Sequence, residues 1–328
     1  MRCVLHGFAV TCTSHFSCSE MNLVFMGTPE FAVPSLKKIV ESGFKISLVV
    51  TSPDKPRQSA HDDPEPTPVK KTAQTLGLRV LEVQALKSPD FERAIRETHP
   101  DVIVVVAFRI LPKEIFTLAQ KGAFNLHASL LPKYRGAAPI NWAIINGETE
   151  TGVSTFFLQE TVDTGNIILQ KSLPIEPQEV ATELAVRLSE LGAEAVVETL
   201  RLIEQGNFTL IPQDESQATR APKLTKENTR IDWTKPAREV FNFIRGLSER
   251  PAAWTTLNHK QFKIYRAALF SETATGEPGQ WILGDNTLYV QCQSGIVEIL
   301  SLQQEGRKRM PASDFLRGFR PTGSEKFV

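Results

Sequence analysis

Short apolar runs alternate with stretches of helical periodicity between residues 22 and 129. The first run, NLVFMG, precedes a segment in which Phe31, Leu36, Ile39 and Val40 recur at helical spacing. The alternation continues through KISLVVTS, LRVLEV, DVIVVVAF and GAFNLHASL. This pattern predicts an α/β fold with a Rossmann-like, mostly parallel sheet and helices on both faces. Such sheets bind ligands beyond the carboxyl ends of their strands.

The pattern changes near residue 207. A long helical stretch ends at Gly206, and the following NFTLIPQDESQATRAPKLTKEN is polar without a sustained period. Beyond it, one helix precedes several short β-type runs separated by turn residues. We expect an α/β domain at 21–207, a linker at 208–225 and a small C-terminal β-barrel of oligonucleotide-binding type at 226–328. Residues 1–20 are expected to be an N-terminal extension that is disordered or not native.

Composition argues against a membrane protein and a secreted one. The longest apolar run, VIVVVAF at 102–108, is shorter than the roughly 18 to 20 residues of a membrane span. Three of the four cysteines lie within the first 20 residues, so no disulfide framework is available. We expect the reducing cytoplasm of a bacterium. The mitochondrial matrix, with residues 1–20 as a presequence, is the weaker alternative.

Two polar residues interrupt the last apolar run. In AFNLHASL a period of two places Asn125 and His127 on one face of a strand, at its carboxyl end. An amide donor beside a protonatable ring suits an oxyanion that develops during acyl transfer. Asp163, in the Asp-Thr-Gly turn of LQETVDTGNIIL, is the candidate third group. Taken singly, a structural histidine and an Asx-turn aspartate are the simpler interpretations; the three residues together favour a site.

Other chemistries lack their motifs. The six histidines and four cysteines show no metal-ligand spacing, and Gly27 is the single glycine after the first strand, so a dinucleotide fingerprint is absent. The sequence contains no P-loop and no G-x-S-x-G elbow. We therefore expect direct transfer between two bound substrates, by polar side chains and without a metal.

NLHASLLPKYRGAAPINWAI, followed by the Asp of VDTGNIIL, resembles the signature of the 10-formyltetrahydrofolate-dependent formyltransferase superfamily. The wider chain, from about 21 to 323, is similar to the methionyl-tRNA formyltransferases. The matching stretches are FMGTPEFAVPSL, VVTSPDKP, ILPKEIF, RIDW and LQQEGRKRMPASDFLRG. The resemblance implies a catalytic domain at 21–207 and a tRNA-binding domain at 226–328. It also implies formyl transfer from 10-formyltetrahydrofolate to initiator methionyl-tRNA. We expect a monomer.

The resemblance implies a role for each matching residue. Asn125 and His127 would hold the formyl oxygen during attack by the methionine amino group, while Asp163 would support His127 and help to move the proton. The folate site would be lined by Ser129, Leu130, Leu131 and Pro132 and by Phe108, Arg109, Ile110 and Leu111. For the leucines, core packing is the alternative. Gly27, Thr28 and Pro29 would face the aminoacyl end of the tRNA.

The basic residues differ from those of the family. After PDKP the family has a Gly- and Arg-rich loop, whereas this chain has Arg57 followed by Asp62, Asp63 and Glu65. The net charge is zero, but residues 207–328 hold 17 Lys and Arg against 13 Asp and Glu. We therefore expect tRNA binding to depend on Arg57, on Lys70 and Lys71, and on the C-terminal domain. Its densest basic group comprises Arg307, Lys308 and Arg309.

Two rival functions remain open. A sugar-nucleotide N-formyltransferase of the same superfamily can also have a small C-terminal β domain. The other rival is a nucleic-acid-binding relative without catalysis, which would bind tRNA without turnover, and the complete Asn, His and Asp set argues against it.

Overall fold

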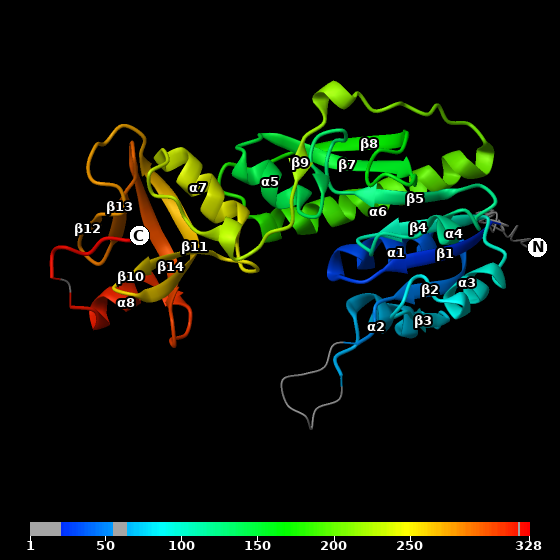
Figure 1. The fold of residues 1–328 in the computed structure, drawn as a ribbon, viewed down its shortest axis with the longest axis horizontal. Helices are drawn as coiled ribbons and strands as arrows, with labels where there is room; N and C mark the ends of the chain where they lie inside the picture. Colours follow the sequence, from blue (N-terminus) through cyan, green and yellow to red (C-terminus); the bar gives the residue numbers. More distant parts are fainter. Residues whose placement is uncertain (1–20, 55–63, 321) are drawn as a thin grey trace, which may run out of the picture.

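A computed structural model describes residues 21–54, 64–320 and 322–328. The predicted extension at 1–20 and the predicted tRNA contact Arg57 lie outside these residues. Two domains lie side by side along the long axis of the molecule (Figure 1). Within the described part of the chain, no helix combines the length and the apolar character needed to cross a membrane.

In its described residues, the first domain has 15 elements. Its strands are β1 (Asn22–Gly27), β2 (Lys45–Thr51), β3 (Val80–Glu82), β4 (Val102–Val106), β5 (Ala123–His127), β6 (Arg135–Gly136), β7 (Glu150–Phe157) and β8 (Ile167–Pro174). Its helices are η1 (Glu30–Ala32), α1 (Val33–Glu41), α2 (Pro68–Thr75), α3 (Pro89–Arg96), α4 (Lys113–Phe116), α5 (Pro139–Ile145) and α6 (Ala181–Gln205). Thr67 and Ser88 cap α2 and α3 with their side chains, each followed by a proline at the first helical position.

A seven-stranded sheet with the order β3-β2-β1-β4-β5-β7-β8 forms the core of this domain. Strands β1 to β5 pair in parallel, whereas β7 and β8 are antiparallel. Alternate side chains enter different layers. Leu23 and Phe25 pack on the side of α1 and α6, and Val24 and Met26 pack on the side of α3 and α4. The predicted α/β fold class is confirmed.

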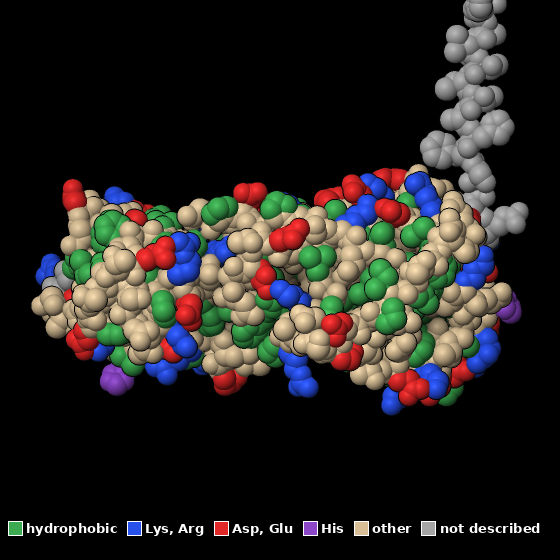
Figure 2. All heavy atoms as spheres, turned by 90° about the horizontal axis from the view of Figure 1, so that it is seen from above, with side chains coloured by type: hydrophobic (Ala, Val, Ile, Leu, Met, Phe, Trp, Pro, Cys, Tyr) green, Lys and Arg blue, Asp and Glu red, His purple; other side chains and the backbone are tan. Residues whose placement is uncertain are grey.

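The second domain is an antiparallel sheet of six strands ordered β10-β11-β14-β13-β12, with β15 paired to β14. The strands are β10 (Ala253–Leu257), β11 (Lys260–Ser271), β12 (Trp281–Leu283), β13 (Leu288–Gln291), β14 (Ile296–Gln304) and β15 (Met310–Pro311), with helices α7 (Ala237–Gly246) and α8 (Ala312–Gly318). Aromatic side chains fill its core, including Trp233, Phe262, Phe315 and Phe327. This arrangement agrees with the predicted C-terminal β domain. Figure 2 shows acidic and basic side chains interspersed over one face of the molecule.

The predicted linker at 208–225 contains η2 (Glu215–Gln217) and β9 (Arg220–Ala221), and η3 (Glu227–Thr229) follows it. It is hydrogen-bonded to the first domain. Ile211 and Ile167 exchange two main-chain hydrogen bonds of 2.9 Å, and β9 pairs in parallel with β6. Main-chain pairing requires no periodic side-chain pattern, and the sequence of this segment has none.

Candidate active site

The polar residues Asn125 and His127 lie at the carboxyl end of β5, in the interior of the sheet. β5 is parallel to β4 and antiparallel to β7, so Asn125 lies between Val105 and Phe156. His127 follows two residues later on the same face. Leu126 points to the opposite face, where it packs closely against Gly192 of α6. The alternation along one strand therefore brings the amide and the imidazole together, as the sequence predicted.

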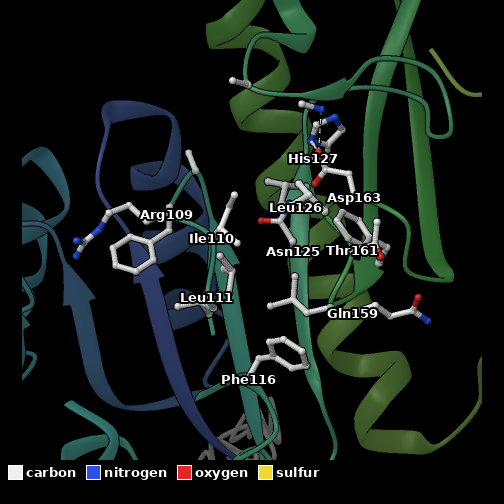
Figure 3. A pocket seen from close by; sticks show the side chains of 18 of the residues that line it. Arg109, Ile110, Leu111, Phe116, Asn125, Leu126, His127, Gln159, Thr161 and Asp163 are labelled. Carbon is white, nitrogen blue, oxygen red and sulfur yellow. Dashed lines mark hydrogen bonds and ion pairs between the residues drawn. The ribbon is translucent and has the colours of Figure 1, made fainter. Parts of the chain in front are cut away.

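His127 is 6% exposed, and one hydrogen bond orients its ring. Nε2 lies 2.9 Å from the carbonyl oxygen of Tyr134. A carbonyl oxygen only accepts hydrogen bonds, so Nε2 bears a hydrogen and donates it. Nδ1 is consequently the nitrogen available to a ligand, and it faces the carboxylate of Asp163 (Figure 3).

The Asp163 carboxylate reaches this position from the loop between β7 and β8. Its Oδ2 accepts a 2.9 Å hydrogen bond from the Gly136 amide and lies 3.9 Å from His127 Nδ1. The His127 and Asp163 side chains are 7% and 11% exposed. Because 3.9 Å exceeds hydrogen-bonding distance, the carboxylate faces the ring without bonding to it and leaves Nδ1 free. We call Asn125, His127 and Asp163 the polar triad.

The Asp-Thr-Gly sequence explains how the loop folds. Asp163 has φ of 56°, a left-handed conformation that Asp tolerates better than most residues. Gly165 approaches β7 so closely that a Cβ there would lie 1.7 Å from the carbonyl oxygen of Phe157. Any larger residue would move the loop.

A cavity of about 680 Å³ opens beside the polar triad. Ile110 and Leu111 lie on one side, and Gln159, Thr161 and Asp163 lie on the other (Figure 3). Phe108 and Phe156 also line the cavity. Ile110 is 73% exposed, so it forms an outer lip rather than part of a packed core. The volume and the mostly apolar walls with a few converging polar groups are typical of a small-molecule site.

Arg109 belongs to the same loop, but its charged end points away from the polar triad (Figure 3). Its guanidinium donates to the main-chain carbonyl oxygens of Val83 and Gln84, the latter at 2.8 Å. Burial lowers the pKa of Arg109. The side chain thus ties the loop at 107–112 to the loop after β3, and only part of it lines the cavity.

Residues 129–132 lie outside the lining of this cavity. Ser154 Oγ donates a 2.7 Å hydrogen bond to the carbonyl oxygen of Ser129 and accepts one of 3.0 Å from the Leu131 amide. These two hydrogen bonds hold the turn against β7. Leu131 is buried in a cluster with Phe156 and Ile167. The placement matches the core-packing alternative for Leu131; the folate contact of Ser129, Leu130, Leu131 and Pro132 stays a prediction.

Gly27 ends β1 at the same edge of the sheet, and Thr28 and Pro29 follow it. Gly27 pairs with Val106, and Thr28 Oγ1 lies 3.1 Å from Ser52 Oγ. Phe31, two residues after Pro29, lines a second cavity of about 200 Å³. Both cavities are lined by His127, so they meet at the polar triad.

The three basic residues after β14 are exposed but not equivalent. Arg309 is engaged: Nη1 lies 3.1 Å from Glu249 Oε1, and the guanidinium lies 4.4 Å from the centre of the Tyr265 ring. For the side chains of Arg307 and Lys308, the described residues supply no ion pair within 4.0 Å. The tRNA role of all three remains a prediction.

Sequence reasoning missed the main-chain partners of the polar triad. The Tyr134 carbonyl orients His127, and the Gly136 amide holds Asp163. Both residues follow the Asn and His motif directly, in KYRGAAP. Gly136 has φ of 127°, and a Cβ there would lie 2.6 Å from the Ala221 carbonyl oxygen. The glycine that follows the polar pair closely in the sequence was the signal that could have indicated a close main-chain contact at this site.

The fold and the polar triad define a class of protein: a parallel α/β domain with an amide, an imidazole and a carboxylate around one ligand cavity, suited to acyl transfer without a covalent nucleophile.

Family models agree with this class. The model described as "Formyl transferase" matches residues 21–200, and "Formyl transferase, C-terminal domain" matches residues 223–320. A protein of Chlorobium phaeovibrioides named "Methionyl-tRNA formyltransferase" is 57% identical over 92% of this chain and 96% of its own length. One of the same name from Geobacter sulfurreducens is 45% identical over 92% and 94%. The chain belongs to the formyl transferase family and, within it, to the methionyl-tRNA formyltransferases.

Solved structures share the fold. An N-formyltransferase from Helicobacter canadensis, in complex with folinic acid and dTDP-3-aminofucose, aligns with a TM-score of 0.66 at 20% identity, over 88% of this chain and all of that one. HypX from Aquifex aeolicus in complex with tetrahydrofolic acid aligns with a TM-score of 0.64 at 20% identity over 91% of this chain. The chain spans about half of HypX, 47% of its length.

Proposed function

We propose that this chain transfers the formyl group of 10-formyltetrahydrofolate to the α-amino group of methionyl initiator tRNA. The main support is the convergence of the polar triad at the wall of the 680 Å³ cavity. Family membership supports the substrate pair, because the relatives are named for methionyl-tRNA and one structural neighbour contains tetrahydrofolic acid.

The cavity fits a folate in size and chemistry. A pterin is flat, and Phe108, Leu111 and Phe156 offer apolar surface for its faces. The residues at 159–163 line the same cavity, where their main-chain groups could pair with its edge. The formyl group would then lie next to Asn125 and His127.

Two donors can address the formyl oxygen in this position. The Asn125 side-chain amide projects from β5 into the cavity, and His127 Nδ1 can donate when the ring is protonated. As the amine nitrogen bonds to the formyl carbon, the carbonyl electrons move to oxygen, and both donors stabilise that charge. The bond from the formyl carbon to N10 then breaks, and a proton passes from the attacking nitrogen to N10. The Asp163 carboxylate stabilises the positive charge on His127 and is placed to relay that proton.

The small second cavity suits the acceptor's side chain. Besides His127, its lining includes Phe31, Ala138, Pro139 and Ile140, and no charged residue among those the structure describes. A methionyl side chain is apolar and flexible, and packs well against aromatic and aliphatic surface. The amine would approach the formyl carbon from this side.

The tRNA body would bind through the C-terminal domain. Arg307 and Lys308 are the basic residues of the triplet that are free to neutralise phosphates, and their domain has an excess of four positive charges. Gly27, Thr28 and Pro29 lie at the sheet edge, where the aminoacyl end would arrive. We propose a monomer that acts without a metal in the bacterial cytoplasm.

A comparison of two formyl acceptors, each offered separately, tests this function. The purified protein is incubated with 10-formyltetrahydrofolate and either charged initiator tRNA or an amino-sugar nucleotide, and formylated product is measured by mass spectrometry. Formylation of the tRNA alone is expected. Transfer to the sugar nucleotide alone would support the rival enzyme, and tRNA binding with no transfer would support the non-catalytic rival.

A further inference from the structure

The stretch at 208–222, which we call the crossing segment, runs back over the loops of the polar triad after leaving α6 (Figure 1). Ile211 is bridged to Ile167, which follows the Asp163 loop, and β9 is paired to β6, which contains Gly136. The two family models match 21–200 and 223–320, so the crossing segment falls between them. It therefore contacts both loops that place the Asp163 carboxylate.

Gln213 is the side chain of this segment that reaches the Asp163 loop. Its Nε2 donates hydrogen bonds of 2.9 Å to the Asp163 carbonyl oxygen and 2.8 Å to that of Gly165. Its Oε1 accepts from Arg135, at 3.0 Å from Nε and 2.7 Å from Nη2. Both donors and both acceptor positions of the carboxamide are thus used.

Arg135 completes the connection. Its guanidinium also pairs with both carboxylate oxygens of Glu215, at 2.8 and 2.7 Å. Its main-chain amide donates a 2.9 Å hydrogen bond to the carbonyl oxygen of Thr219. The amide of its neighbour Gly136 donates to the Asp163 carboxylate. The Arg135 side chain is only 13% exposed, so its charge is held in place rather than solvated.

The Asp163 residue is therefore fixed at two points. Gly136 holds the carboxylate, and Gln213 holds the main-chain carbonyl of the same residue, in a conformation with φ of 56°. Without the carboxamide, the left-handed residue would keep only one of these hydrogen bonds. A small rotation would then change the 3.9 Å separation from His127.

We propose that Gln213 is a positioning residue, which links the Asp163 loop to Arg135 and so holds the Asp163 carboxylate facing His127. The inference rests on the proposed formyl transfer. It adds that a residue between the two family domains controls the rate of the chemical step without touching either substrate.

The test is a double-mutant cycle in the full-length protein. Gln213→Ala is compared with the parent protein, and again in an Asp163→Asn background, by single-turnover formyl transfer and by steady-state kinetics. We expect kcat to fall about 10- to 100-fold in Gln213→Ala with KM for both substrates little changed, the usual cost of removing a side chain that orients a functional group. In the Asp163→Asn background the same change should cost almost nothing further, because the group through which Gln213 acts is gone.

Two further variants keep the result interpretable. Gln217→Ala removes an exposed glutamine of the same segment and should leave kcat unchanged. Gln213→Met preserves length without hydrogen bonds, and replaces Gln213→Ala in the cycle if thermal melting shows that the alanine variant unfolds early. Unchanged kcat in both Gln213 variants, or an undiminished loss in the Asp163→Asn background, would overturn the inference. A parent protein that transfers no formyl group would instead overturn the proposed function.

Discussion

Replacing Asp163 with Asn is the sharpest test of the polar triad. The amide keeps the shape of the side chain and an oxygen that can accept from Gly136, but it removes the negative charge. That charge lies 3.9 Å from His127 Nδ1. At an effective dielectric constant of roughly 20, two unit charges at this distance interact by about 4 kcal/mol. Since His127 Nδ1 can donate to the formyl oxygen only when the ring is protonated, losing this stabilisation of the imidazolium corresponds to roughly a 10³-fold decrease in kcat.

The assay is single-turnover transfer at saturating donor and acceptor, because product release then does not hide the chemical step. Asp90→Asn, which neutralises an exposed carboxylate on α3, is the matched control and should not alter the rate. Circular dichroism and thermal melting check that both variants fold. A rate for Asp163→Asn within about tenfold of the parent would refute the reasoning, since the charge would then contribute no more than about 1.4 kcal/mol to the transition state.

Three other predictions follow from the same structure. Asn125→Ala should lower kcat by about 10²- to 10³-fold, the usual effect of losing one oxyanion donor, without changing the melting temperature. Arg307→Ala with Lys308→Ala should weaken tRNA binding and reduce the slope of log K against log salt by about two, whereas an unchanged slope would place the phosphate contacts elsewhere. Burial raises the pKa of Tyr134 to about 12. This folded-state pKa exceeds the value near 10 of an exposed tyrosine. The contribution of the neutral Tyr134 phenol to the free energy of unfolding is therefore complete below about pH 10 and is lost as the pH rises towards 12. The loss is at most about 3 kcal/mol. Between pH 10 and pH 12, the melting temperature of Tyr134→Phe should therefore decrease less than that of the parent protein.

The fold class and the polar pair could be predicted because both depend on local periodicity. Alternation between strands and helices sets the layers, and the period of two within AFNLHASL sets the shared face of Asn125 and His127. The Asp-Thr-Gly turn similarly showed a residue able to adopt a left-handed conformation at Asp163. Each of these features requires only neighbours within a few residues.

The remaining features depend on contacts between distant residues. Nothing local distinguishes an Arg109 that faces a ligand from one that bonds to the carbonyl oxygens of Val83 and Gln84, 26 and 25 residues away. Gln213 binds a loop 50 residues earlier, from a segment whose polar composition is typical of a linker. Leu131 is buried only because Phe156 and Ile167 lie on the strands behind it. Periodicity describes one element at a time, so it could not assign these partners.

The chain that forms the site also fixes the C-terminal domain relative to it. Three residues after Gly136 the backbone enters α5, which packs against α7 of the second domain. The Asn141 side chain donates a 2.7 Å hydrogen bond to the Gly246 carbonyl oxygen. A Cβ on Gly246 would lie 2.6 Å from the Ile145 side chain, so the glycine permits close contact between the two helices. Arg245 is 7% exposed, and it donates a 3.1 Å hydrogen bond to the carbonyl oxygen of Glu179, just before α6. The packed junction therefore holds the C-terminal domain at a set distance from the polar triad.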